Sequence, residues 1–458
     1  MKTFLTSLFL IILCLSACDN AQKTTCIESE KFVMRADTCS IVDGYPINKH
    51  VTTSPSYLFD LYLEKYPCCL SQIKKLSLDT KHITKASLSN LEKFTNLQSL
   101  KLTGYDSLPD VIGNLIQLKK LQIVNPKKEI FIPNSVQNLT KLKEVIVWAS
   151  KFPSNLVKVP NLESLITNGI HSQQYFPKNI SSLRKLKRLD IGYSSIFPNQ
   201  IIQLKKLTYL KFEFTLHEDD KIDSSFIVPS EISNLTKLSY LNLTSGELDT
   251  LPKSIGKLTH LKTLYLPYLT KAPTSLNKLQ DLEYLYITRS KMFPLKGIEE
   301  VLAQLPNIKQ LSYSSMKLGN PEKLVKPFSK LTRLEKLDFI GDFSDLPNRL
   351  FIPSIKHLYI YCPLKKSPLK LFPQGIFRLK KLEDLTIFNT NISFVPNKIS
   401  SLENLRALNL KYNQIKKLPP SLHKLNHLQY LGIEKKNLKA NKRILDTLKL
   451  KNPQLLID

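Results

Sequence analysis

The chain has 458 residues, of which 42% are hydrophobic and 23% charged, and this composition is typical of a folded protein long enough for several domains. Lysine and arginine number 66 against 38 acidic residues, giving a formal net charge of +28, but the basic residues are spread along the whole chain. Because there is no basic helix or local Lys/Arg run, this charge indicates a general compositional bias and does not predict a nucleic-acid partner.

The first residues, MKTFLTSLFLIILCLSAC, combine one lysine, an apolar run and small residues before a cysteine. The run is too short for a spanning helix and lies where a secretory signal lies. Leu15-Ser16-Ala17-Cys18 resembles a bacterial lipobox, which implies cleavage after residues 1–17 and lipid attachment to Cys18. Two lipid signals would anchor the chain stably to a bacterial membrane, on the periplasmic side or at the cell surface. The alternative is a plain secretory signal that happens to precede a cysteine.

Residues 18–25 are expected to form a tether, and residues 26–72 a cysteine-containing N-terminal cap. The disulfide candidates in this cap are Cys26, Cys39, Cys68 and Cys69. Export favours disulfides, and four cysteines allow three pairings, which the sequence leaves open. Cys68 and Cys69 are expected to bond to different partners, because a bond between adjacent cysteines is strained. No histidine has ligand spacing here, so no metal site is predicted.

From about residue 73 the pattern L-x-x-L-x-L recurs, with a mean step of about 24 residues, within the range typical of repeats. Its first positions, called anchors below, are Ile73, Leu97, Leu118, Leu142, Leu162, Leu186, Leu207, Leu238, Leu261, Leu282, Ile308, Leu334, Ile355, Leu382, Leu405 and Leu428. A second pattern follows each predicted strand: an apolar residue, Pro and spaced aliphatics, as in "LPKSIGKL" (251–258) and "LPPSLHKL" (418–425). The proline fixes φ and ends the strand, and the aliphatics fill the other side of the repeat.

These two patterns, in phase, resemble the leucine-rich-repeat superfamily, and together with the lipobox they resemble a bacterial leucine-rich-repeat lipoprotein. The resemblance implies an α/β solenoid (a horseshoe) with a parallel concave β-sheet and an irregular, short-helical convex side. About sixteen repeats are expected over 73–437, with a C-terminal helical cap at 438–458. Fuller helices are predicted at 297–305 and 321–331. The family's usual asparagine at the ninth repeat position fits well at Asn413 alone, so a looser asparagine ladder is expected.

Aromatic residues alternate with aliphatics in the predicted strands, as in LEYLYITRS (282–290). Side chains alternate faces along a strand, so if Leu285 and Ile287 enter the core, Tyr284 and Tyr286 point onto the concave sheet. Trp148 maps outward in the same way. The resulting candidate ligand-binding residues are Tyr209, Tyr240, Tyr265, Tyr268, Tyr284, Tyr286, Arg289, Tyr359 and Tyr361.

Two explanations of these aromatics stay open at this level. Stacked rings on neighbouring strands stabilise a sheet, by about 0.2–1 kcal/mol per pair. An exposed aromatic band also marks a binding surface, because Tyr and Trp give rigid contact area with a polar handle. The resemblance favours binding, because the concave face is the usual ligand face of that family. The expected function is therefore a protein- or peptide-binding module of the bacterial envelope. Glycan or cell-wall polymer binding and a purely structural envelope role are the alternatives.

The sequence contains no catalytic signature, and no enzyme activity, cofactor or catalytic residue is predicted. The P-loop, HExxH, GxSxG and GxGxxG motifs are all absent. The insertion that carries His217, Glu218, Asp219, Asp220 and Asp223 lacks the spacing of a calcium loop, so it is expected to be a solvated polar loop. Cys362, alone within the repeats, is expected to be a free thiol.

Overall fold

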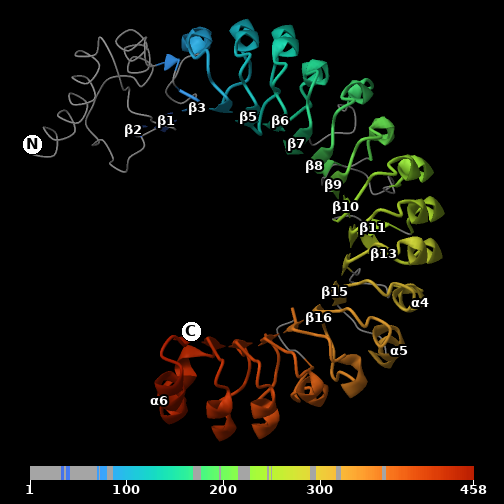
Figure 1. The fold of residues 1–458 in the computed structure, drawn as a ribbon, viewed down its shortest axis with the longest axis vertical. Helices are drawn as coiled ribbons and strands as arrows, with labels where there is room; N and C mark the ends of the chain where they lie inside the picture. Colours follow the sequence, from blue (N-terminus) through green and yellow to red (C-terminus); the bar gives the residue numbers. More distant parts are fainter. Residues whose placement is uncertain are drawn as a thin grey trace, which may run out of the picture. The chain divides into compact units, whose positions relative to one another are not determined.

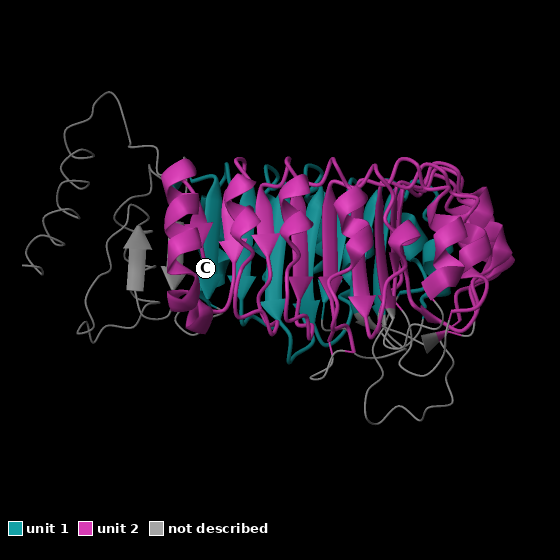
Figure 2. Cartoon of the chain, turned by 90° about the horizontal axis from the view of Figure 1, so that it is seen from below, with its two compact units in different colours: residues 1–217 teal, residues 218–458 magenta. Residues whose placement is uncertain are grey.

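The computed structural model describes residues 32–35, 38–41, 70–71, 73–79, 86–168, 177–194, 197–214, 227–244, 247–248, 250–288, 295–315, 321–363 and 368–458. The chain divides into two compact units, Met1–His217 and Glu218–Asp458, which Figure 2 shows in different colours. Of the candidate residues, Cys18, Cys26, Cys68, Cys69 and Arg289 lie outside the described residues, as do His217 to Asp223, and Cys39 is described only by its backbone in a strand.

Parallel strands follow one another in chain order through the first unit. They are β3 (Lys75–Asp79), β4 (Ser99–Thr103), β5 (Lys120–Asn125), β6 (Glu144–Ala149), β7 (Ser164–Asn168), β8 (Arg188–Ser194) and β9 (Tyr209–Phe214). Before them, β1 (Phe32–Arg35) and β2 (Thr38–Ile41) pair antiparallel, and β1 continues the sheet in parallel with β3. A short 3-10 helix precedes most strands: η1 (Ser87–Lys93), η2 (Asp110–Asn114), η3 (Asn134–Asn138), η4 (Ser154–Lys158), η5 (Ile180–Ser182) and η6 (Asn199–Gln203).

The second unit repeats this plan. Its main strands are β10 (Tyr240–Asn242), β12 (Thr263–Leu266), β14 (Tyr284–Ile287), β15 (Gln310–Ser315), β16 (Lys336–Gly341), β17 (His357–Tyr361), β18 (Asp384–Phe388), β19 (Ala407–Asn409), β20 (Tyr430–Gly432) and β21 (Leu456–Ile457). A separate two-stranded sheet joins β11 (Glu247–Leu248) to β13 (Tyr268–Leu269).

The helical turns of the second unit include α-helical ones within 297–305 and 321–331, where fuller helices are predicted, but these are shorter than predicted. The turns are η7 (Ser230–Asn234), η8 (Lys253–Lys257), η9 (Thr274–Lys278), η10 (Pro321–Leu324), η11 (Asn348–Leu350), η12 (Gln374–Arg378), η13 (Asn397–Ser401), η14 (Pro420–Lys424), η15 (Lys435–Asn437) and η16 (Lys439–Asn441). The α-helices are α4 (Ile298–Leu302), α5 (Val325–Phe328) and α6 (Lys442–Lys451). Within each unit, strands line one side and helical turns the other (Figure 1).

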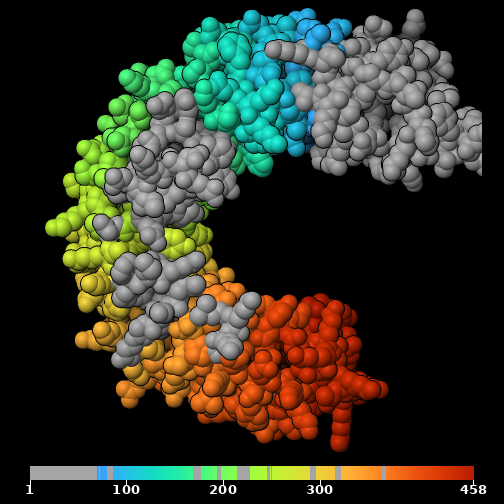
Figure 3. All heavy atoms as spheres, turned by 180° about the vertical axis from the view of Figure 1, so that it is seen from behind, coloured from blue at the N-terminus to red at the C-terminus, as the bar shows by residue number. Residues whose placement is uncertain are grey.

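The core of each repeat lies between its strand and its helical turn. In the repeat that contains "LPKSIGKL", the anchor Leu261 and the strand residue Leu264 are fully buried. Pro252, with φ −62° and ψ 142°, is still extended and starts η8, whose Ile255 is also fully buried. The proline thus ends one layer and aims the next aliphatic into the core, as predicted. On the described parts of the face in Figure 3 the colours follow one another in chain order, so segments close in sequence lie side by side within each unit.

Asparagines link successive repeats at two places. Asn413, at the predicted ninth position, is 4% exposed and donates to the carbonyls of Ile387 (2.6 Å) and Leu410 (2.8 Å). Its side-chain oxygen accepts from the Thr390 backbone N–H (3.2 Å), so this part of the ladder expectation is confirmed.

A second asparagine column, which the sequence analysis did not identify, lies one residue before the anchors. Each side-chain amide donates to a backbone carbonyl one repeat earlier. The pairs are Asn96 with Ser71, Asn161 with Thr140, Asn307 with Gln280 and Asn404 with Lys380, at 2.7 to 2.9 Å. These bonds fix the spacing of repeats at the entry to the strands.

An alternating charge column lies one residue after the anchors in the second unit. Lysine or arginine on one repeat faces glutamate on the repeat before. The pairs are Lys309 with Glu283 (2.9 Å), Lys356 with Glu335 (3.2 Å) and Arg406 with Glu383 (3.7 Å). In the first unit, Lys187 and Lys143 both bond to Glu163, and these bonds lower the pKa of Glu163 to about 2.

Candidate functional site

Three tyrosines form a stack on the strand face of the second unit. Tyr265 on β12 and Tyr286 on β14 are register partners, while their neighbours in sequence enter the core. The two rings are parallel within 2°, with centroids 3.8 Å apart. Tyr240 on β10 adds a tilted contact to Tyr265 at 5.7 Å. We call Tyr240, Tyr265 and Tyr286 the tyrosine stack.

The tyrosine stack is a neutral surface with hydroxyl groups at its edge. Burial raises the pKa of the Tyr265 hydroxyl well above its ordinary value, and hydrogen bonds with Tyr286 and Tyr240 add to that shift. All three residues are half-buried, so ring surface is still available to a partner. The stack therefore combines flat apolar area with polar groups, as recognition surfaces often do.

A second set of rings lies further along the same unit. Tyr361 lies 6.1 Å from Tyr359 and 5.8 Å from Phe388, and Phe388 lies 4.7 Å from Tyr412, measured between ring centroids. Tyr412 has a left-handed backbone (φ 58°) and is 59% exposed. Its backbone N–H donates to the Glu434 carboxylate at 2.6 Å, which holds this conformation. We call these four aromatic residues the C-terminal aromatic cluster.

A shallow hollow of about 600 Å³ lies beside this cluster on β16, β17 and β18. Its lining residues are Lys336, Asp338, Ile340, His357, Leu358, Tyr359, Asp384 and Thr386. We call it the inner hollow. Its two carboxylates belong to Asp338 and Asp384. Asp338 is the register partner of Tyr359, and Asp384 is the register partner of His357.

The two carboxylates of the inner hollow differ in environment. Burial raises the pKa of Asp338, although Lys336, a hydrogen bond with Gln310, and His357 partly oppose this effect. The Asp384 carboxylate lies 2.5 Å from His357 Nδ1, within hydrogen-bond distance. Burial also raises the pKa of Tyr359, with smaller contributions from Tyr361 and Asp338. The hollow thus holds a carboxylate that is poorly solvated and lies against a neutral phenol.

The first unit carries a different strand face. The Arg188 guanidinium lies 3.7 Å from the centre of the Tyr209 ring. Asp190 lies 3.5 Å from Arg188 and 3.8 Å from Lys211, and Lys211 also pairs with Glu213 at 2.8 Å. Tyr209 is therefore part of a charged network.

The structure places most of the predicted tyrosines on strand faces, as the alternation predicts. Tyr268 is an exception, because it lies on β13 in the separate two-stranded sheet. Pro267 follows β12 and has no N–H for the ladder, so the main strand ends at Leu266. Trp148 points outward as expected and is 41% exposed.

Asp338, His357 and Asp384 are not among the site residues predicted from the sequence. They occupy the same outward positions of L-x-x-L-x-L as the tyrosines, in "LEKLDF" (334–339), "IKHLYI" (355–360) and "LEDLTI" (382–387). The same alternation would have identified them if all outward side chains had been aligned, and not only the aromatic ones.

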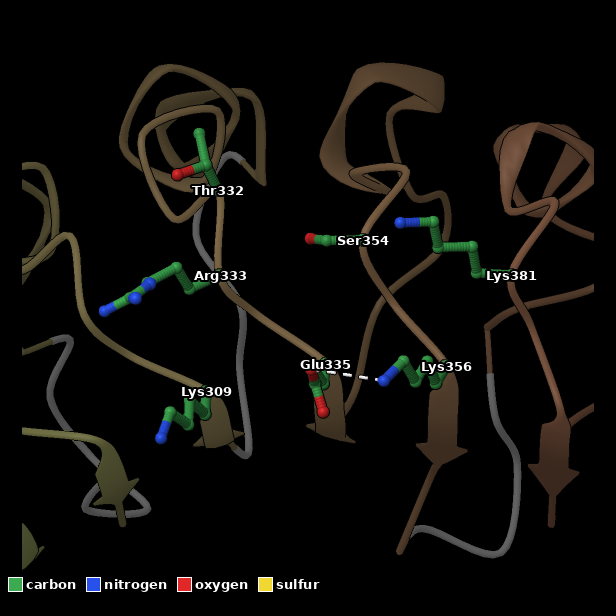
Figure 4. Close-up of a pocket in the computed structure, with 7 residues that line it drawn as sticks. All are labelled: Lys309, Thr332, Arg333, Glu335, Ser354, Lys356 and Lys381. Carbon is green, nitrogen blue, oxygen red and sulfur yellow. Dashed lines mark ion pairs between the residues drawn. The ribbon is translucent and has the colours of Figure 1, made fainter.

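A second hollow, of about 330 Å³, lies on the flank of the second unit (Figure 4). Its lining residues are Lys309, Thr332, Arg333, Glu335, Ser354, Lys356 and Lys381. Ser354 takes the place of an asparagine in the column before the anchors, and its buried hydroxyl has no hydrogen-bond partner. Arg333 bonds to Asn307 (2.7 Å), and Lys356 to Glu335. The hollow thus lies where Ser354, one residue before its anchor, has a side chain too short to reach the preceding repeat.

The described residues hold no group of three or more His, Cys, Asp or Glu side chains that could bind a metal ion. Within the same part of the chain, none of the helices has the length and apolar character to cross a membrane. Cys362 is buried, and its Sγ lies 3.8 Å from Asp342 Oδ1.

Comparison with known proteins agrees with this architecture. A family model described as a leucine-rich repeat region matches residues 199–376. A leucine-rich-repeat protein of Leptospira interrogans has a similar structure, with a TM-score of 0.62 and 25% identity over 86% of this chain and 98% of that one. The chain is therefore a leucine-rich-repeat solenoid.

Two curated relatives match part of this chain over a minority of their own length. The TMV resistance protein N of Nicotiana glutinosa is 26% identical over 50% of this chain and 24% of its own length. The human volume-regulated anion channel subunit LRRC8B is 26% identical over 68% of this chain and 37% of its own length. The chain thus spans between about a quarter and two fifths of these relatives.

Proposed function

We propose that the chain is a non-enzymatic interaction module that binds a protein or peptide partner through the strand face of its second unit. The tyrosine stack is the observation that carries this proposal. Its rings offer apolar surface that is already ordered by stacking, so these side chains lose little further freedom when a partner binds there. Tyrosines of this kind often dominate binding energies at protein interfaces.

Lipid attachment at Cys18, and with it a place on the bacterial membrane facing the periplasm or the exterior, is part of the same proposal. It rests on the lipobox-like residues 15–18 and the apolar run before them. Labelling of the full-length chain in a bacterial host with a clickable fatty acid tests it, beside Cys18→Ser. Label on the parent alone supports the anchor, and equal label on both rejects it.

Photo-cross-linking from the strand face tests the binding proposal. Benzoylphenylalanine replaces Tyr284, which lies beside the stack, or Phe394, which is 61% exposed in the loop after β18. The two full-length variants are irradiated in bacterial envelope extract. We expect a discrete protein adduct from position 284 alone, which is lost when Tyr240, Tyr265 and Tyr286 are changed to serine in a chain that still melts cooperatively. Equal adducts from both positions, or none from 284, would reject the proposal.

Glycan binding is an outcome of the same experiment. Flat rings also stack on sugar faces, and an adduct sensitive to glycosidases would replace the protein partner by a glycan. The strand face offers no cation to attract an anionic polymer at the outward positions of β10, β12, β14 and β15, which carry no charged side chain among the described residues. A structural role alone is indicated if no adduct forms and the serine variant melts much lower.

A further inference from the structure

Charge is distributed unevenly between the strand face of the second unit and the rest of the chain. The chain as a whole carries 66 basic and 38 acidic residues. On the strand face the outward positions of β10, β12, β14 and β15 are uncharged in the described residues, and those of β16 to β18 hold two carboxylates, one lysine and one histidine. The abundant lysines are thus largely kept off this face.

The basic groups near Asp338 and Asp384 do not make this region strongly positive, as the chain as a whole is. His357 contacts Asp384 at 2.5 Å, and Lys411, further along the face, pairs with Asp458 at 2.7 Å. Asp338 is more buried than an ordinary surface carboxylate, with Lys336 on its own strand and His357 and Tyr359 on the next. A cationic group that enters the hollow would therefore meet a carboxylate that lacks much of its hydration.

We propose that the inner hollow accepts a lysine or arginine side chain of a basic peptide segment in the partner, with Asp338 and Asp384 as its anionic groups. This inference rests on the proposed function and adds the chemistry of the partner. The ammonium or guanidinium group bonds to the Asp338 carboxylate, and its aliphatic stem lies against Tyr359. Tyr361, at 6.1 Å from Tyr359, extends the aromatic wall for the next residues of the peptide.

The carboxylates of the inner hollow are complementary to a cation, although the chain as a whole is positively charged. A formal charge of +28 repels basic peptides at long range. At about 0.15 M salt the screening length is about 8 Å, so that repulsion fades while direct contacts in the hollow persist. Hydrogen bonds between a carboxylate and a cation are stronger than those between neutral groups, and the π-faces of tyrosine attract cations as well.

A hexalysine peptide is the probe, and hexaserine and hexaglutamate of equal length are compared with it. Binding to the full-length chain is measured by isothermal titration calorimetry at pH 7.5 and about 0.15 M salt. We expect hexalysine to bind more tightly than hexaserine. Asp338→Asn combined with Asp384→Asn is expected to weaken hexalysine binding by about tenfold or more, the equivalent of one lost charged hydrogen bond.

The matched control changes Asp281→Asn and Asp446→Asn, two exposed carboxylates away from the hollow in the same unit. This control alters the net charge equally, so it is expected to leave hexalysine binding unchanged. The inference is overturned if hexalysine binds no tighter than hexaserine, or if both double variants weaken it alike. Hexaglutamate binding measures attraction to the lysines elsewhere on the chain. Its affinity is expected to be unchanged by Asp338→Asn and Asp384→Asn.

The cross-linking experiment separates this inference from the proposed function. If position 284 captures a protein but hexalysine fails to bind, the partner chemistry is wrong and the interaction face stands. If hexalysine binds through the two aspartates but no strand-face adduct forms, the cationic subsite stands and the protein-binding proposal fails.

Discussion

Replacement of Tyr265 by serine is expected to destabilise the second unit more than the same change at Tyr284. Tyr265 is the central ring of the tyrosine stack and contacts two others, at 3.8 and 5.7 Å between centroids. Each aromatic pair contributes about 0.5–1.5 kcal/mol beyond its buried area. Tyr284 is half-buried on the same face and outside the stack. The expected excess loss in the free energy of unfolding is therefore about 1–3 kcal/mol.

The assay is guanidinium unfolding of the full-length chain, followed by circular dichroism at pH 7. A double-mutant cycle with Tyr286→Ser isolates the closest ring pair, and a coupling of about 0.5–1.5 kcal/mol is expected. Tyr265→Phe keeps the rings and removes the hydroxyl, so it separates stacking from hydrogen bonding. Equal losses for Tyr265→Ser and Tyr284→Ser, with no coupling to Tyr286, would refute the argument that the stack is preformed.

Three further changes test other parts of the structure. Asp338→Asn is expected to raise the melting temperature at pH 7, because burial places the folded-state pKa of Asp338 above its unfolded value. The gain should shrink as pH falls through that raised pKa, and a gain independent of pH would contradict this explanation. Asn413→Ala should lower the free energy of unfolding by about 3 kcal/mol, from three lost hydrogen bonds, in denaturant titration; a loss below that of Asn404→Ala would contradict it. Ser354→Asn should raise it by about 1 kcal/mol by reaching the Thr332 carbonyl, and a lower stability would show that the flank hollow cannot hold an amide.

The repeat architecture was predictable because its causes are local in sequence. The alternation of Leu264, Tyr265 and Leu266 fixes which side chains enter the core, and Pro252 marks the change from strand side to turn side. Asn413 was also found from its position within a single repeat.

The candidate site was less predictable because it depends on register between repeats. The sequence shows that Tyr265 and Tyr286 point outward, but not that their rings lie parallel at 3.8 Å. The inner hollow required the lateral alignment of Asp338 with Tyr359, which are 21 residues apart in the chain. Tyr268 lies in a separate two-stranded sheet because Pro267 ends the main strand at Leu266, an effect that a repeat pattern alone does not include.

The alternating charge column of the second unit repeats its sign every two repeats, whereas the backbone of that unit repeats its structure in every repeat. Glu283, Lys309, Glu335 and Lys356 follow each other in sign order. Deletion of a single repeat would set Glu283 against Glu335, although the leucines would still align. Gain or loss of repeats in this part of the chain is therefore expected to be tolerated best in pairs, which sets the unit in which such a solenoid can be lengthened or shortened.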